Sequence, residues 1–583
     1  MRHSILGASW RNLTADPEHC ACLTRELNLQ PVVAHVLAAR GITAASDAGE
    51  YLHGSLDDLH DPLVMRDMPE AVACLRRAVE AGGLIRVCGD YDADGVTATA
   101  LLVRALRALG ATVDYYLPHR VADGYGLNIP AIEQAAQDGV RLLLTVDCGV
   151  SAFDQLRRAQ ELGLEVIVSD HHEPPAELPP AAAILNPKRG DCAYPFKDLS
   201  GVGVAYKLLH ALAADMKLRR GAERAFLDLV AIGTVADVVG LTGENRILVK
   251  HGLSALNQTR KHGVQALLRA ASISPPVTSY NVAFGLAPRL NAAGRLDHAQ
   301  AAAVLLMTSD PAEASNLAEH VCSLNTQRRD EERRILQSAE EMIRSSADLD
   351  RERMILLAAE GWHAGVIGIV ASRLVERHYR PVVLVAIADG FARGSARSIP
   401  GFHICDALAN CSSLLEEFGG HELAAGFSIA PDNIEALRSK LAAQAVEALR
   451  PEDLVRVMTI DAWADLSGLS LEAVEGINAM APFGAGNPQP VIGLRNLTVE
   501  SVDTCGAEGR HLRLVLREGD VATGAIWFSF GHVVAHLPPG TVVDACCLPE
   551  IDEWGGSRSV RLKLRDLALD QPLSDGPAAT AAT

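Results

Sequence analysis

The chain has 583 residues, 49% of them hydrophobic, and a formal net charge of −19. Its length predicts several domains, and it has no uninterrupted apolar run of about 18 residues, the length needed to cross a membrane. The negative charge argues against a protein that coats nucleic acid nonspecifically, because such binding needs clustered Lys and Arg. The 12 cysteines include no C-x-x-C pair and indicate reduced thiols, so we expect a cytoplasmic protein with no membrane partner.

Strand-like and helix-like segments alternate from Leu84 onward, after an expected helical lead-in over residues 1–75. Short apolar runs that predict strands are separated by amphipathic helices; the runs lie at 84–88, 112–117, 142–146 and 165–168. This alternation predicts an α/β domain with a doubly wound parallel sheet over residues 76–305. Ligands of such sheets bind beyond the carboxyl ends of the strands, so functional residues are expected there.

Three carboxylates stand at alternate positions directly after the first predicted strand, at Asp90, Asp92 and Asp94. Their mutual repulsion makes such a cluster costly unless a cation neutralises it. Carboxylate oxygens of this kind suit Mg²⁺ or Mn²⁺. The segment therefore predicts a site for a hard divalent cation.

Other apolar runs of the same domain also end in possible metal ligands. The residues concerned are Asp147, Asp170-His171-His172 and Asp237. A lone Asp after a strand is more often a helix cap or turn residue, but parallel strands bring all of these to one edge of a sheet. One of two neighbouring imidazoles can bind a metal and the other a substrate phosphate, while Asp170 holds one ring in the required tautomer.

The remainder of the chain predicts four further segments. Ser309-Asp310-Pro311 starts a helix, with Asp310 as the N-cap, that continues to about residue 345 and is expected to connect domains over 306–348. A solvated face on an ordinary helix would give the same pattern. A second α/β domain is expected over 349–452, a small β-barrel over 453–572, and a disordered Ala- and Thr-rich tail over 573–583.

Several motifs resemble those of the DHH phosphoesterase superfamily, most closely its RecJ family of exonucleases specific for single-stranded DNA. In the first domain they are Asp90-Tyr91-Asp92-Ala93-Asp94-Gly95, Thr145-Val146-Asp147-Cys148-Gly149 and Ser169-Asp170-His171-His172. Further along they are 287–296, 361–363, the glycine-rich segment 419–427, which resembles the signature of a DHHA1 domain, and 482–488, which resembles the start of an OB-type domain. The resemblance covers roughly residues 80–570.

The resemblance implies two divalent cations, Mn²⁺ or Mg²⁺, that activate water for attack on a phosphodiester. The implied metal ligands are Asp92, Asp94, Asp147, His171 and Asp237, with Asp90 as a further one. The implied catalytic group is Asp170, His171 and His172. In several relatives a histidine stands four residues before the D-x-D pair, where this chain has Cys88. Coordination of the first cation is therefore open, and Asp90 could compensate.

An enzyme that acts on a DNA strand must also bind phosphates and bases. Guanidinium groups suit terminal phosphates, and aromatic rings such as that of Tyr125 stack on bases. Arg289 and Arg295 are expected to flank a loop of small residues, 291–294, that lets a phosphate approach the backbone. The candidate substrate-binding residues are His119, Arg120, Tyr125, Arg289, Asn291, Arg295, Arg393, Ser395, Arg397 and His421.

The family implies an exonuclease that degrades single-stranded DNA from the 5′ end in DNA repair and recombination, together with a DNA helicase and a single-strand-binding protein. One alternative is a DHH phosphodiesterase acting on oligoribonucleotides or cyclic dinucleotides, against which stand the chain length and the triple-acid motif. The other is a catalytically inactive DNA-binding scaffold. That alternative predicts that residues able to bind metal are replaced by others, whereas here the acids and histidines of all the motifs are present.

Overall fold

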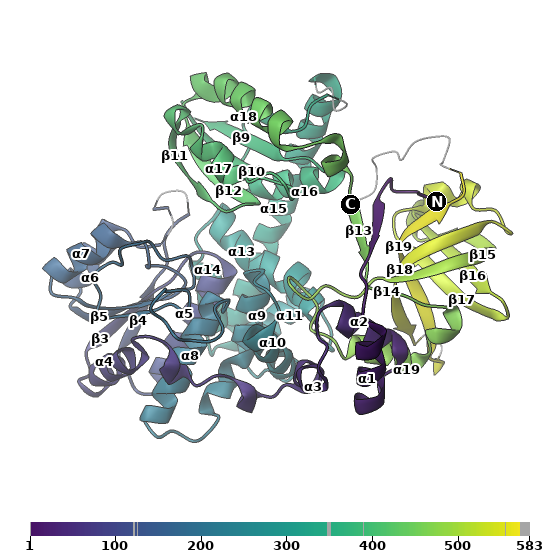
Figure 1. The fold of residues 1–583 in the computed structure, drawn as a ribbon. Coiled ribbons are helices and arrows are strands. Elements are labelled where there is room, and N and C mark those ends of the chain that lie inside the picture. The colour runs from purple at the N-terminus through teal and green to yellow at the C-terminus, as the bar shows by residue number, and fades with distance from the viewer. Residues whose placement is uncertain are drawn as a thin grey trace. The chain divides into compact units, whose positions relative to one another are not determined.

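The computed structural model describes residues 2–120, 123–124, 126–346, 351–388, 390–553 and 556–571 (Figure 1). The chain forms two compact units. The central unit comprises His53–Arg329 and Pro482–Pro488, and the terminal unit comprises Met1–Leu52, Asp330–Ala481 and Gln489–Thr583. Among the described helices, none combines the length and the apolar character that crossing a membrane requires.

The central unit contains a five-stranded parallel sheet with strand order β4-β3-β5-β6-β7. The strands are β3 (Leu84–Cys88), β4 (Val113–Tyr116), β5 (Val140–Thr145), β6 (Glu165–Ser169) and β7 (Ala183–Leu185). The helices that accompany them are α4 (Met68–Glu80), α5 (Ala93–Ala108), α6 (Ile129–Gln137), α7 (Phe153–Glu161) and α8 (Gly201–Asp215).

Both faces of this sheet are buried, because alternate side chains of one strand enter different cores. In β5, Leu142 and Leu144 pack into a core with residues of α4, α5 and α8, whereas Leu143 packs into another with residues of α6 and α7. Helices therefore cover both faces, as in doubly wound sheets. The predicted fold class is confirmed.

The rest of the central unit is helical. Its helices are α9 (Leu227–Ala236), α10 (Gly243–Leu256), α11 (His262–Ala270), α12 (Ser279–Asn281), the π-helical turn η4 (Val282–Leu286), α13 (Ala287–Leu296) and α14 (Gln300–Met307). The expected long helix is α15 (Pro311–Ser346), and Asp310 caps it by accepting a hydrogen bond from Ala312 N at 2.8 Å. The boundary between the two units falls inside this helix, after Arg329.

The terminal unit contains a second α/β layer, a five-stranded sheet with strand order β11-β12-β10-β9-β8. Its elements are β8 (Ile355–Glu360), α16 (Ile367–His378), β9 (Val382–Ala388), β10 (Phe391–Arg397), α17 (Ile404–Ala409), β11 (Leu415–Gly420), β12 (Ala424–Ile429) and α18 (Ile434–Ala448). Leu437 and Leu441 of α18 share a core with Val383 and Phe427 of the sheet. Only β8 and β9 pair in parallel among the described strands of this sheet.

The C-terminal part of the terminal unit is the expected small barrel. Its strands are β15 (Ile492–Cys505), β16 (His511–Glu518), β17 (Val521–Trp527), β18 (Val542–Asp552) and β19 (Ser559–Leu569). The strands pair in the closed order β15-β16-β17-β19-β18-β15, which leaves none of the five with an open edge along its whole length. Trp527 is 2% exposed and stacks on Phe530, whereas Phe528 is 44% exposed.

The N-terminal segment joins this barrel. Strand β1 (His3–Ser4) pairs antiparallel with β19, and β2 (Ser9–Asn12) pairs in parallel with β13 (Val457–Ile460). The helices expected in the lead-in follow as α1 (Pro17–Leu27), α2 (Pro31–Ala39) and α3 (Ala45–His53). The short elements β14 (Ala462–Trp463) and α19 (Leu471–Asn478) precede the barrel.

Candidate metal centre

The carboxyl ends of three neighbouring strands lie side by side in the central unit. Cys88 at the end of β3 is opposite Thr145 of β5, and Leu144 of β5 is opposite Ile167 of β6. The predicted segments 90–94, 147 and 170–172 follow these three strand ends directly. Strand order also reverses between β3 and β5, the position at which doubly wound sheets bind their ligands.

Two helix N-termini hold the carboxylates of the first motif. Asp92 caps α5, and its Oδ1 accepts hydrogen bonds from Asp94 N at 2.9 Å and Gly95 N at 3.1 Å. Asp94 is 1% exposed and accepts hydrogen bonds from Gly201 N at 2.7 Å and Val202 N at 2.9 Å, in the first turn of α8. The positive end of each helix dipole favours these negative groups.

Two glycines allow helices to approach the carboxylates this closely. A Cβ on Gly201 would lie 2.5 Å from Asp147 Oδ1, and a Cβ on Gly233 of α9 would lie 2.8 Å from Asp94 Oδ1. Both distances are shorter than van der Waals contact. A larger residue at Gly201 would therefore press on Asp147, and one at Gly233 would meet Thr97 Oγ1 at 2.2 Å as well as Asp94.

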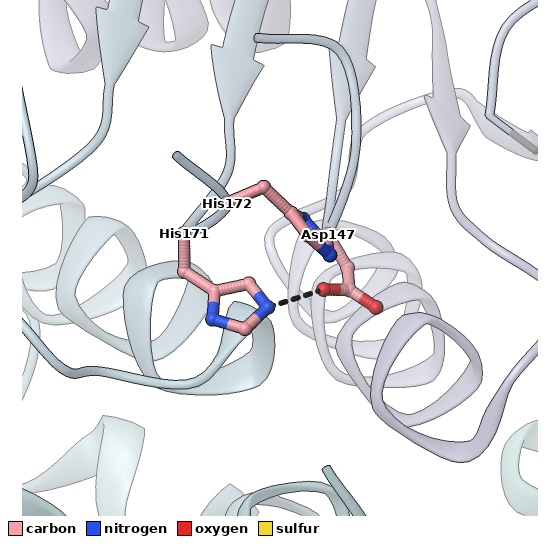
Figure 2. Close-up of side chains that lie close together, drawn as sticks. All are labelled: Asp147, His171 and His172. Carbon is pink, nitrogen blue, oxygen red and sulfur yellow. Dashed lines mark ion pairs between the residues drawn. The ribbon is translucent and has the colours of Figure 1, made fainter. Parts of the chain in front are cut away.

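Asp147, His171 and Asp237 meet at the centre of the cluster. His171 Nε2 lies 3.0 Å from Asp147 Oδ1 and 3.7 Å from Asp237 Oδ2. Figure 2 shows the imidazole of His171 directed at the carboxylate of Asp147, with His172 beside it. Ligand atoms of Asp147, His171 and His172, and likewise of Asp94, His171 and Asp237, lie within 4.8 Å of one another.

The polar atoms of this cluster fit a divalent cation. His171 Nε2, Asp237 Oδ2 and Asp90 Oδ1 are buried and form no hydrogen bond within the part of the chain that the structure describes. Buried polar atoms that form no hydrogen bond are rare, because each costs about 1–3 kcal/mol. Oxygen and imidazole nitrogen ligands at such positions suit Mn²⁺ or Mg²⁺.

Electrostatics support the same conclusion. Burial raises the pKa of Asp94 and of Asp147 well above the usual value, and the neighbouring carboxylates raise it further. Burial, followed by the charge of Asp92, raises the pKa of Asp237 to about 7. Burial and the neighbouring His172 lower the pKa of His171 to about 3, which leaves the neutral imidazole that binds metals. These carboxylates repel one another unless a cation lies among them.

Asp170 orients the loop after β6. Its Oδ1 accepts hydrogen bonds from His171 N at 2.7 Å and His172 N at 3.1 Å and lies 2.7 Å from His172 Nδ1, while its Oδ2 accepts one from Val150 N at 2.9 Å. Burial alone would lower the pKa of His172, but the hydrogen bond and charge of Asp170 raise it. Asp170 therefore fixes the ring orientation of His172, the arrangement expected from the sequence.

Cys88 and Asp90 lie beside this cluster. Burial raises the pKa of the Cys88 thiol to about 12, so the thiol stays neutral. Asp90 is 2% exposed, and burial and the charge of Asp92 raise its pKa. Neither residue belongs to the two close groups of metal-ligand atoms found among the described residues.

Helix α13 packs on the first motif, which corrects one expectation. Residues 291–294 lie inside α13 and form no loop. Asn291 Oδ1 accepts a hydrogen bond from Ala93 N at 2.8 Å, and a Cβ on Gly294 would lie 2.3 Å from Tyr91 O. The small residues therefore allow helix α13 to pack closely on the backbone of the first motif.

The other candidate substrate residues of the central unit differ in their surroundings. Arg120 lies over the ring of Tyr91, 4.7 Å from its centroid, and the ring of His119 lies 6.1 Å from that of His298. Arg295 is near enough to Tyr91 to act on its pKa electrostatically. Tyr125 lies outside the described residues. Arg289 donates to Gly285 O at 2.6 Å and to Cys322 Sγ at 3.2 Å.

The remaining candidates lie in the terminal unit. Arg393, Ser395 and Arg397 alternate along β10 and so share one face of its sheet. Arg397 Nη1 donates to Ser395 Oγ at 3.2 Å. His421 directly follows β11, is exposed, and donates its N–H to Ala424 O at 2.8 Å.

Two features of the site were not predicted as parts of it. The backbone amides of Gly201 and Val202 hold Asp94, and His298 lies beside His119. The Gly-Val-Gly sequence at 201–203 is too short a pattern to assign a role from sequence. His298 carries no local signal, because its neighbour lies far away in the sequence.

Comparisons with known proteins agree with this arrangement. Three family models match the chain: the DHH family, N-terminal domain over residues 84–234, the DHHA1 domain over 352–447, and the RecJ OB domain over 460–566. The single-stranded-DNA-specific exonuclease RecJ of Escherichia coli (strain K12) is 37% identical over 563 residues, which cover 92% of this chain and 95% of that protein. The chain belongs to the RecJ family.

Further members of the RecJ family support this assignment. RecJ of Bacillus subtilis (strain 168) is 37% identical over 565 residues, which cover 96% of this chain and 71% of that protein. The crystal structure of RecJ from Thermus thermophilus in complex with Mn²⁺ superposes with a TM-score of 0.83 at 33% identity, covering 96% of this chain and 79% of that one. A structure of the same RecJ in complex with Mg²⁺ gives a TM-score of 0.77.

Proposed function

We propose that this chain is an exonuclease that hydrolyses the phosphodiester bonds of single-stranded DNA, using two divalent cations, Mn²⁺ or Mg²⁺. The observation that carries the proposal is the buried cluster of carboxylates and His171 at the aligned strand ends of the central unit. Relatives named single-stranded-DNA-specific exonuclease RecJ match nearly the whole chain. Cleavage from the 5′ end follows from membership of this family.

The residues divide into two groups of metal ligands. Asp94, His171 and Asp237 would hold one cation, and Asp147 and Asp92, whose charge acts on the neighbouring carboxyls, would supply ligands to the other. Bound cations would lower the pKa of a water molecule and stabilise negative charge on the phosphate oxygens. Asp90, with its unsatisfied Oδ1, is a further candidate ligand.

The remaining residues would orient the substrate and move protons. His172, held by Asp170 with its pKa raised, would carry a proton and donate a hydrogen bond to a phosphate oxygen. His119, Arg120, Asn291 and Arg295 would bind the strand near the first motif. Arg393, Ser395, Arg397 and His421 would bind phosphates from the terminal unit, with Tyr125 and Arg289 as further candidates.

Three finer statements belong to the same proposal, the biological role and the partners from family membership, the location and the boundaries from the sequence pattern. The enzyme would act in DNA repair and recombination in the cytoplasm. It would work with a DNA helicase that opens duplexes and with a single-strand-binding protein. We keep the predicted domain boundaries, 76–305, 306–348, 349–452 and 453–572, as part of this proposal.

The test uses single-stranded DNA labelled at either end, with Mn²⁺, Mg²⁺ or EDTA, beside duplex DNA and a cyclic dinucleotide. We expect stepwise loss of the 5′ label only when metal is present. Asp147→Asn should abolish cleavage, and Asn keeps the left-handed backbone of Asp147, which has φ 60°. Asp154→Asn, an exposed acid of α7, is the matched control and should keep full activity. Survival of single-stranded DNA while the dinucleotide is cut would contradict the proposal.

A further inference from the structure

Asp237 caps the C-terminus of α9, where its N–H donates to Gly233 O at 2.9 Å, and a loop follows it. Val238 has φ 66°, an uncommon conformation for a β-branched residue, and is 69% exposed. The next residues that the structure anchors are Gly240 and Leu241, before α10 begins at Gly243. Helix α9 therefore fixes Asp237 from its N-terminal side, and Gly240 and Leu241 hold the chain on its C-terminal side.

A side chain of the following helix, α10, holds Gly240. Asn245 of α10 is fully buried, and its Nδ2 donates to Gly240 O at 3.1 Å and to Asp198 O at 2.6 Å. Asp198 precedes the N-terminus of α8, whose first amides hold Asp94. Asn245 thus ties the Asp237 loop to the segment that supports another carboxylate of the cluster.

The other anchor is the segment 482–488, which is far away in the sequence but belongs to the central unit. Ala485 O accepts a hydrogen bond from Leu241 N at 2.8 Å, and Phe483 O accepts one from Ser279 Oγ at 2.6 Å. A Cβ on Gly484 would lie 2.7 Å from Leu241 Cδ1, so the turn and the loop are in close contact.

Hydrogen bonds within the segment 482–488 stabilise its turn. Gly484 and Asn487 exchange backbone hydrogen bonds at 2.9 and 3.2 Å, and the buried side chain of Asn487 donates to Pro482 O at 2.8 Å. Gly486 has φ 66°, and a Cβ there would lie 3.0 Å from Gly240 Cα. A rigid turn that contacts backbone can transmit any displacement to the loop.

We propose that Pro482–Pro488 is a positioning segment for the metal centre: by holding Gly240 and Leu241 it fixes Asp237 at the distance from His171 that a cation requires. The inference rests on the proposed metal centre. It gives the segment a role in the chemistry of the central unit, beyond joining the chain to the barrel. Groups that orient metal ligands in this way typically change metal affinity about 10–100-fold when altered.

The test is Gly486→Ala, with Mn²⁺ affinity measured by calorimetry and the exchange of the Leu241 amide hydrogen measured in metal-free protein. We expect Mn²⁺ to bind about tenfold more weakly and the Leu241 amide to exchange faster. The matched control is Gly519→Ala. Gly519 also has positive φ, 56°, but an added Cβ meets no atom within 4 Å, so this variant carries similar backbone strain without touching the loop.

A second variant allows the same test if the first variant does not fold. If Gly486→Ala does not fold, Ser279→Ala removes the hydrogen bond to Phe483 O, and Mn²⁺ affinity should fall about threefold. Wild-type Mn²⁺ affinity in a folded Gly486→Ala, or in Ser279→Ala where that variant is needed, would overturn the positioning role alone. A wild-type protein that binds no Mn²⁺ would overturn the proposed metal centre, and with it this inference.

Discussion

Mn²⁺ binding should release protons, and the contribution of Asp237 should depend on pH between 6 and 8. Its pKa of about 7 implies that about 0.9 of this carboxyl is protonated at pH 6 and about 0.1 at pH 8. A cation binds only the deprotonated form, so its binding should release about 0.8 more protons at pH 6 than at pH 8, and affinity should rise with pH. His171 adds nothing, because its pKa of about 3 leaves it neutral at both pH values.

Calorimetry in buffers of different ionisation enthalpy counts these protons directly. Asp237→Asn should weaken Mn²⁺ binding and remove most of the difference between the two pH values. The pKa values of Asp94 and Asp147 are also raised. Their carboxyls can therefore add to the number of protons released when the cation binds. Equal proton release at pH 6 and pH 8, or an unchanged difference in Asp237→Asn, would refute the reasoning.

The same shift predicts how stability depends on pH without metal. The folded-state pKa of Asp237 is raised, so the folded protein holds a proton that the unfolded chain loses near the usual Asp value. Stability of the metal-free protein should therefore fall as the pH rises from about 4 to about 7. Thermal unfolding in EDTA measures this decline, and added Mn²⁺ should reverse it.

Three further changes test separate parts of the structure. Asp170→Asn should lower kcat about 10–100-fold in a steady-state nuclease assay, because it weakens the contact that orients His172. Gly201→Ala should weaken Mn²⁺ binding at least about tenfold in calorimetry, whereas Gly190→Ala, where a Cβ meets nothing within 4 Å, should not. Leu562→Ala, in the barrel core, should cost about 2–5 kcal/mol in denaturant unfolding yet leave Mn²⁺ affinity unchanged, and coupled losses would contradict this separation.

The positions of Asp90, Asp147 and the histidines could be predicted because they depend on local sequence. Asp237 was expected after a further strand, but its apolar run forms helix α9, which Asp237 caps. A parallel strand places the residues that follow it at one edge of the sheet, and the apolar runs before Asp90, Asp147 and Asp170 identify those strands. The doubly wound fold followed from the same runs. These inferences need only the chain order and the period of the apolar residues.

The supports of the site could not be predicted, because they join distant segments. The Gly201 N–H donates a hydrogen bond to Asp94 across 107 residues of sequence, and no local motif at either residue indicates this contact. The small residues of 291–294 suggested a phosphate loop, since glycine and alanine suit close approach by a ligand or by a packed helix alike. Only the structure shows that Gly294 faces Tyr91.

The pairing of β1 with β19, with His3 opposite Leu569, bears on how the chain is made. The N-terminal strand leaves the ribosome almost a full chain length before its partner, a delay on the order of a minute at about 5–20 residues per second. The whole of His53–Arg329 is synthesised in that interval. Nascent chains should therefore carry an unpaired N-terminal strand while the central unit is synthesised.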